Sequence, residues 1–310
     1  MRVLEQLDRD EIARLLDAGE FFWLDLAAPS GADVQAVGEV FGLHPLAVED
    51  SAEFGQRPKL DDYGETALLV FYGVHDDGRL AEVHLHLSGS WMVTLRADGD
   101  ECVAAAKHRF AAEDPRSEEE AIYRVLDTLA DSFFPVLDRI DEQIDALMDE
   151  MVERPRPGQR HEIFELRRRL VELRRVVGPQ RDVMARGGDL VERMPGLEAD
   201  HARDWFRDVY DHLMHLSETI DSFRDILSGA LDVYLSTQSN RLNEVTKQLT
   251  LVATIFLPLT FVTGFFGQNF GTLVRHINTP LAFWAYGVGV MLASAALLYA
   301  WFRRSGFFQD

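Results

Sequence analysis

The stretch that decides the fold is Leu249–Val274, LTLVATIFLPLTFVTGFFGQNFGTLV, which lies between Lys247 and Arg275 and contains no ionisable side chain. A helix through this stretch is long enough to cross the apolar part of a bilayer, which needs about 20 residues. A second apolar run, Ile277–Phe302, follows closely and ends at Arg303. The sequence therefore predicts a C-terminal transmembrane hairpin.

One face of the first predicted span is small or polar. Its residues recur at alternating steps of three and four, which places them on one stripe of a helix. The stripe consists of Asn243, Thr246, Thr250, Ala253, Leu257, Thr260 and Gly264. The opposite, apolar face consists of Leu251, Val252, Ile255, Phe256, Leu259, Val262 and Phe266.

Two roles fit the stripe. Small residues allow two helices to pack closely, whereas a polar line that continues to Gly267-Gln268-Asn269 is better explained by a water-filled path. We favour the path. Because one hairpin cannot enclose a pore, the path predicts a homo-oligomer.

Three stretches of the chain resemble the CorA-type magnesium transporter family. Asn243–Phe270, NEVTKQLTLVATIFLPLTFVTGFFGQNF, is similar to the first transmembrane helix of the family and to its Gly-Met-Asn signature, which reads Gly267-Gln268-Asn269 here. Phe41–Leu60, FGLHPLAVEDSAEFGQRPKL, and Trp205–His212, WFRDVYDH, are similar to segments further upstream. The resemblance covers nearly the whole chain, and only the middle residue of the signature departs from it.

The resemblance implies a funnel-shaped homopentamer in the lipid bilayer that mediates passive influx of magnesium, with cobalt or nickel as further substrates. It implies that Gly267, Gln268 and Asn269 form a selectivity ring that holds a hydrated ion by its waters. Neutral amide oxygens suit that role, because magnesium gives up water reluctantly. The predicted pore-lining residues are Asn243, Thr246, Leu249, Thr250, Ala253, Leu257, Thr260 and Gly264. By position, Leu249 and Leu257 resemble apolar constrictions, with routine helix packing as the alternative for Leu249.

The resemblance also implies that cytoplasmic magnesium gates transport. Asp50 and Asp208 match positions that bind a regulatory divalent ion between neighbouring subunits, and Glu49 with Asp127 resembles a second pair. Hard oxygen ligands suit magnesium. In a chain with 52 acidic residues, a single carboxylate is otherwise far more often solvated surface, so these residues depend on the resemblance.

Alternative functions stay open at this stage. Zinc-transporting relatives also vary the middle residue of the signature, so Gln268 is compatible with a zinc transporter. Asp208, His212 and His215 share a helix face and could bind a softer metal. A membrane-tethered scaffold or sensor would use the hairpin only as an anchor.

Composition excludes several classes of protein. The net charge of −21 argues against nucleic acid as a partner, since phosphates would be repelled, and it is compatible both with attracting cations and with ordinary solubility. Cys102 is the only cysteine, so no intramolecular disulfide can form. Without a nucleophile and base, a phosphate loop or a catalytic metal motif, the sequence predicts neither an enzyme nor an organic cofactor.

The charged N-terminus lacks the apolar segment of a signal peptide, so we expect the bulk of the chain on the side where it is made. Positive residues are unevenly distributed around the spans. Arg241, Lys247, Arg303 and Arg304 flank the proposed inner side, against Arg275 in the outer loop. This distribution predicts a multi-pass protein of the cell membrane with both termini in the cytoplasm.

Residues 1–100 show the mixed pattern of a small α/β domain. The predicted strands are Phe21–Leu26, Ala67–Val74, Glu82–Leu87 and Trp91–Leu95, and the predicted helices are Gly31–Phe41 and Pro45–Ser51. His84 and His86 alternate with apolar residues. We expect both to point to one solvent-exposed face and not to bind metal.

Residues 101–246 are predicted to form a helical stalk, and residues 247–310 the hairpin. Glu118–Val152 is expected to be one acidic amphipathic helix that packs antiparallel to a basic helix, Arg160–Val177. Gly178-Pro179 and a loop around Gly187-Gly188 are expected to follow. The last helix is predicted to start near Leu197 and to run unbroken into the first span.

Overall fold

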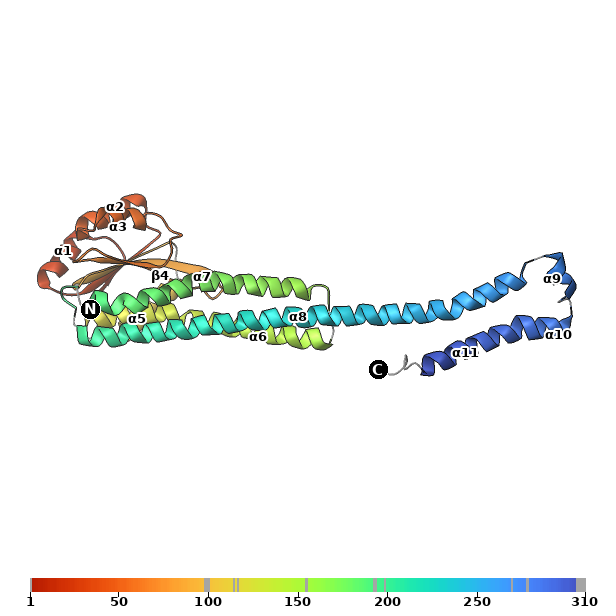
Figure 1. The fold of residues 1–310 in the computed structure, drawn as a ribbon. Helices are drawn as coiled ribbons and strands as arrows, with labels where there is room; N and C mark the ends of the chain where they lie inside the picture. Colours follow the sequence, from red (N-terminus) through yellow and green to blue (C-terminus); the bar gives the residue numbers. More distant parts are fainter. Residues whose placement is uncertain are drawn as a thin grey trace. The chain divides into compact units, whose positions relative to one another are not determined.

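The computed structural model describes residues 2–97, 101–113, 115, 117–153, 156–191, 194–197, 199–268, 270–276 and 279–304. The chain divides into two compact units, Met1–Asp232 and Val233–Asp310. The first unit contains a mixed α/β domain and a group of long helices (Figure 1). The second contains the apolar helices.

A six-stranded sheet forms the centre of the α/β domain, with strand order β1-β2-β6-β5-β4-β3. The pairs β1–β2 and β2–β6 are parallel, and the others are antiparallel. The strands are β1 Arg2–Leu4, β2 Phe22–Ala27, β3 Lys59–Asp62, β4 Ala67–Val74, β5 Leu80–Leu87 and β6 Trp91–Arg96. The four predicted strands are confirmed within two residues at each end, while β1 and β3 were missed.

Helices cover both faces of this sheet. On one face lie α1 Arg9–Ala18, α2 Gly31–Phe41 and α3 Pro45–Ser51, as Figure 1 shows. The core there joins Ile12 and Val37 of these helices to Leu24 and Val93 of the sheet. On the other face, α4 Glu101–Glu113 brings Phe110 against Trp23, with ring centroids 5.5 Å apart.

The expectation that His84 and His86 face solvent is wrong. The two side chains share a face of β5, as the alternation predicts, but they are 0% and 1% exposed because helices cover both faces of the sheet. The Nε2 atom of His84 lies 2.8 Å from Glu82 Oε1, and that of His86 lies 2.8 Å from Ser51 Oγ. The alternation of polar and apolar residues in β5 shows that the two histidines lie on the same side of the sheet. It does not show whether helices cover that side.

The helix expected over Glu118–Val152 is divided into α5 Glu118–Asp131 and α6 Phe133–Glu153. Pro135 has no N–H to donate to the carbonyl of Asp131, which weakens the helix at this point. The hydroxyl of Ser132 donates to Leu129 O at 2.6 Å and accepts the N–H of Val74 at 2.9 Å. The break therefore also ties the two helices to β4.

The predicted interruptions at Gly178-Pro179 and Gly187-Gly188 are wrong, because α7 runs from Gln159 to Val191. It runs antiparallel to α6 (Figure 1). Tertiary contacts override the local helix-breaking signals: Gln180 accepts the backbone N–H of Tyr72 in the sheet. Arg174 of this basic helix pairs with Asp221 of α8 at 2.6 Å rather than with the acidic α6.

The last long helix, α8, runs from Ala199 to Phe266, 68 residues without a break. Its start lies two residues from the prediction, and it runs unbroken into the first span as predicted, through Gly229 and Pro258. Short helices α9 Gly271–His276 and α10 Pro280–Ala282, a π-helix Phe283–Gly289 and α11 Val290–Arg304 follow. The segments Arg203–Phe266 and Pro280–Arg304 are each long and apolar enough to cross a membrane.

Candidate ion pathway and regulatory metal site

The predicted pore-lining stripe is exposed along the whole of its length in the single chain. All eight residues from Asn243 to Gly264 are exposed, and Leu249 and Leu257 are 69% and 71% exposed. The half-buried residues of the same helix segment lie on the opposite side: Lys247, Leu251, Thr254, Ile255, Pro258, Leu259, Val262 and Phe266. Val252, Phe256 and Phe261, which lie off the stripe, are exposed as well. The stripe is therefore part of a broader face that α8 leaves unpacked within one chain.

Two threonines of this region, Thr260 and Thr263, are hydrogen-bonded to their own helix. Thr260 Oγ1 donates to Phe256 O at 2.8 Å, and Thr263 Oγ1 donates to Leu259 O at 3.0 Å. A hydroxyl that donates its proton to the backbone has only lone pairs left. On the exposed stripe, Thr260 therefore offers an acceptor, which suits the waters around a cation better than an anion.

The signature begins at the end of α8. The N–H of Gly267 donates to Thr263 O at 2.9 Å, and a Cβ at Gly267 would lie only 3.0 Å from the same oxygen. Glycine is therefore the residue that fits this turn without displacement. Gln268 is exposed, and Asn269 lies outside the described residues.

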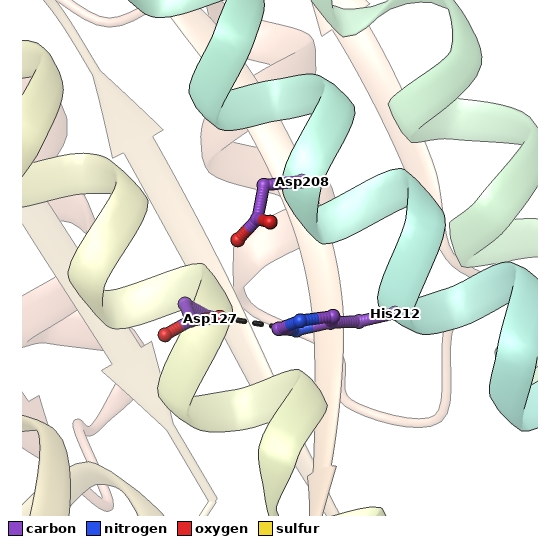
Figure 2. Close-up of side chains that lie close together, drawn as sticks. All are labelled: Asp127, Asp208 and His212. Carbon is purple, nitrogen blue, oxygen red and sulfur yellow. Dashed lines mark ion pairs between the residues drawn. The ribbon is translucent and has the colours of Figure 1, made fainter.

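A second candidate site lies on the helices of the first unit. Asp127 of α5 meets Asp208 and His212 of α8, and ligand atoms of the three lie within 4.8 Å of one another (Figure 2). Asp208 and His212 are one helical turn apart, which places both side chains on the face towards α5. The expected partner His215 is exposed and not in this group, so Asp127 takes its place.

Two atoms of this cluster are buried without a hydrogen bond. Asp127 is 2% exposed, and its Oδ1 atom lies 3.2 Å from His212 Nδ1 in a geometry too poor for a hydrogen bond. His212 Nδ1 also lies 3.3 Å from Asp131 Oδ1. Unsatisfied buried acceptors are costly unless an ion or water satisfies them. Two carboxylates and an imidazole nitrogen fit a divalent metal ion.

The surroundings set the charge of the cluster. Arg109 Nη1 lies 2.7 Å from Asp127 Oδ2, and Tyr123 Oη donates to Asp208 Oδ2 at 2.7 Å. Burial, followed by the negative charge of Asp127, raises the pKa of Asp131. Arg124 is also close enough to interact with the charge of Asp127, so two arginines face the carboxylates of Asp127, Asp131 and Asp208.

Asp50 and Glu49 lie on α3, where Asp50 is half-buried and Glu49 is exposed. The two expected pairs, Asp50 with Asp208 and Glu49 with Asp127, are predicted to form between neighbouring subunits, and a single chain does not test them. The structure instead brings Asp127 and Asp208 together, which spacing along the sequence does not reveal. It also shows that Lys59 contacts Asp50.

Taken together, the α/β domain, the continuous α8 and the second apolar helix are the architecture of a membrane ion transporter. The chain belongs to the CorA-like Mg2+ transporter family, whose family model, described as CorA-like Mg2+ transporter protein, matches residues 18–304.

Similar proteins agree with this assignment. The cobalt/magnesium transport protein CorA of Thermotoga maritima is 33% identical, over 98% of this chain and 88% of that protein. The complete structure of the CorA magnesium transporter from Methanocaldococcus jannaschii matches with a TM-score of 0.79 and 20% identity, over 92% of this chain and 90% of that one. The zinc transport protein ZntB of Yersinia enterocolitica is 27% identical over 74% of this chain and 71% of that protein. The chain is a CorA-family divalent cation transporter of the membrane and not an enzyme.

Proposed function

We propose that this protein mediates passive influx of magnesium through a homopentamer whose axis is lined by the exposed stripe of α8. The observation that carries this proposal is the exposed line of small and oxygen-bearing side chains, opposite the half-buried face. Its hydroxyl and amide oxygens are neutral. Such a lining can bind the waters of a hydrated magnesium ion without stripping them.

Mutation of the signature tests this proposal. Asn269→Ala should abolish magnesium uptake into liposomes while leaving the oligomer intact on size-exclusion chromatography. The matched control is Asn240→Ala, which makes the same truncation on α8 but off the stripe. Uptake by Asn269→Ala at the wild-type rate would overturn the proposal.

Zinc is the second candidate substrate, because the chain is also similar to ZntB and because His212 adds a nitrogen ligand to the acidic cluster. Gln268 differs from the methionine of the signature that the chain resembles. Uptake of magnesium, cobalt, nickel and zinc should therefore be compared in one liposome preparation. Faster uptake of zinc than of magnesium at equal concentration would reverse our assignment. Membership in a transporter family favours either cation over the scaffold alternative.

For orientation, we propose that both termini lie in the cytoplasm of a cell-membrane protein. Arg303 and Arg304 form the last turn of α11, whereas the connection between the spans carries Arg275 and His276. Single cysteines introduced after α11 and in α9 test this, in a Cys102→Ala background. An impermeant thiol reagent added to whole cells should label only the cysteine in α9.

For regulation, we propose that internal divalent ions bind at Asp127, Asp208 and His212, with Asp50 and Glu49 supplied by the neighbouring subunit. Binding would draw subunits together and close the pore, and depletion would let the Leu257 constriction widen. A ligand shifts this equilibrium only by its differential affinity, so the closed ring must bind more tightly.

The ligand chemistry of His212 gives a test of this site. His212→Ala should weaken inhibition by internal cobalt more than inhibition by internal magnesium, because imidazole is a much better ligand for cobalt. His215→Ala, on the same helix but outside the cluster, is the control. If His212→Ala weakens inhibition by the two ions equally, or weakens neither, His212 is not a ligand of the regulatory ion.

A further inference from the structure

The carboxylate of Asp50 forms an ion pair with the ammonium group of Lys59. The Nζ atom of Lys59, at the start of β3, contacts Asp50 Oδ2 and lies 3.0 Å from Asp61 Oδ2. The side chains of Lys59 and Asp50 are 29% and 32% exposed, so the pair is partly withdrawn from water. A lysine ammonium is charged at neutral pH, so the contact is an ion pair.

The two backbone segments that carry Lys59 and Asp50 are both held in place by hydrogen bonds. Lys59 pairs with Val70 in the register between β3 and β4, so its backbone is held by the sheet. The side-chain amide of Gln56 donates to the backbone oxygen of Asp50, and the hydroxyl of Tyr72 donates to Gln56 O. These bonds hold the end of α3 against the sheet. The contact between Lys59 and Asp50 thus joins two anchored segments, unlike a pair of mobile surface side chains.

We propose that Lys59 is the resident cation of Asp50, which a divalent ion must displace, so that Lys59 sets the ion concentration at which transport is inhibited. The inference rests on the proposed regulatory role of Asp50. When the divalent ion binds Asp50, the ammonium of Lys59 can pair with Asp61 instead, because Nζ already lies within bonding distance of both carboxylates. Displacement then needs only a rotation of one flexible side chain, and the lysine charge stays paired.

This arrangement determines which ions can act. A monovalent cation gains nothing by replacing an ammonium of equal charge, whereas a divalent ion gains a second charge at the carboxylate. The tethered lysine also raises the concentration that a divalent ion needs. A raised threshold suits feedback by an abundant ion and keeps trace metals from closing the pore.

Inside-out patches of the full-length protein, with internal magnesium as the only divalent ion, provide the test. In Lys59→Gln the half-inhibitory concentration should fall roughly twofold to fivefold, the range expected for loss of one partly exposed ion pair. The matched control is Arg57→Gln, which removes the same charge from an exposed site two residues away and should keep the wild-type value. Lys59→Arg should also stay near that value. Thermal unfolding midpoints check that each variant is folded.

Asp61 supplies a change of the opposite sign. Asp61→Asn should raise the half-inhibitory concentration, because the ammonium is then committed to Asp50. In the double variant with Lys59→Gln this increase should disappear. If Asp61→Asn raises the half-inhibitory concentration equally in the wild type and in Lys59→Gln, Asp61 acts on the bound ion directly through its charge. The proposal that Lys59 moves from Asp50 to Asp61 is then overturned.

Asp50→Asn separates this inference from the proposed function. If Asp50→Asn abolishes inhibition by magnesium but Lys59→Gln keeps the wild-type half-inhibitory concentration, Lys59 has no such role and the regulatory proposal stands. If Asp50→Asn leaves inhibition intact, the regulatory proposal itself fails. A lowered value in Lys59→Gln together with loss of inhibition in Asp50→Asn supports both.

Discussion

The phenyl ring of Phe206 in α8 occupies the space that a side chain at position 187 of α7 would need. A Cβ at Gly187 would lie 2.4 Å from Phe206 Cδ1, and both residues are buried. Glycine at position 187 therefore lets α7 lie against α8 at this point. Phe206 precedes Asp208 by two residues, so this contact also fixes the segment that presents the acidic cluster.

Gly187→Ala should destabilise the protein by about 1–3 kcal/mol, since an added methyl group in a packed interface forces its neighbours to move. The measurement is the thermal unfolding midpoint in detergent. Gly229→Ala on α8 is the control, because nothing lies within 4 Å of its Cβ position. There alanine should be neutral or stabilising by up to about 1 kcal/mol. Equal effects of the two substitutions would contradict a close contact between Gly187 and Phe206.

Strong periodic patterns made parts of the fold predictable. The helices Gly31–Phe41 and Pro45–Ser51 and the strand Ala67–Val74 have the predicted ends. Each has its own local signals, such as the capping box of Ser30 and Asp33. The two spans were predictable because an uninterrupted apolar run of about 20 residues is typical of a helix that crosses a membrane.

Tertiary contacts created the parts that could not be predicted. Gly178-Pro179 is a strong local stop signal, yet α7 continues because buried residues on both sides hold it against the sheet. The polar strand Lys59–Asp62 has no alternating apolar pattern and exists through its pairing with β4. The cluster of Asp127 with Asp208 joins residues 81 positions apart, so the packing of α5 on α8 creates it.

Gly267→Ala should slow magnesium uptake, because its Cβ would lie 3.0 Å from Thr263 O at the turn that leads to the signature. Relieving that contact must shift the end of α8 and with it the proposed ring. Gly271→Ala, whose Cβ would meet nothing within 4 Å, is the matched control and should transport normally. Uptake in liposomes measures both. A normal rate in Gly267→Ala would show that the turn tolerates a side chain.

Leu257→Ala should increase basal flux and weaken inhibition by internal magnesium. Leu257 is 71% exposed on the stripe, so copies around an axis would form an apolar constriction that a smaller side chain opens to water. Val252→Ala, an equally apolar truncation off the stripe, should leave flux unchanged. If the two variants behave alike, Leu257 faces lipid or a neighbouring helix and the constriction lies elsewhere.

Arg275→Glu should speed magnesium uptake at low salt. The exposed Arg275 lies in the last turn of α9, close to His276, so the connection between the spans repels cations. The effect should fade as salt rises, because the screening length falls from about 30 Å at 0.01 M to about 10 Å at 0.1 M. Equal rates for wild type and variant at 0.01 M salt would make the charge of this loop irrelevant to uptake.

The buried His86 makes stability depend on pH. Burial, together with the nearby His84, lowers the pKa of His86 to about 3. Between about pH 6.5, the ordinary value for histidine, and pH 3, the unfolded chain binds a proton that the folded chain does not. The stabilising contribution of neutral His86 is therefore complete above about pH 6.5 and is lost as the pH falls. The slope approaches about 1.4 kcal/mol per pH unit for one such group.

Thermal unfolding midpoints between pH 7.5 and pH 5 test this contribution. Glu82, which faces His84, adds a similar loss only below about pH 5, because hydrogen bonds from His84, Gly55 and Gln56 outweigh burial and lower its pKa from the ordinary carboxyl value. Measurements that stop at about pH 5 therefore separate the contribution of His86 from that of Glu82. His86→Gln should have a lower midpoint at pH 7.5 but a shallower fall towards pH 5. His215→Gln, at an exposed site, should keep the wild-type slope, and an unchanged slope in His86→Gln would mean that His86 takes up its proton without leaving its place beside Ser51.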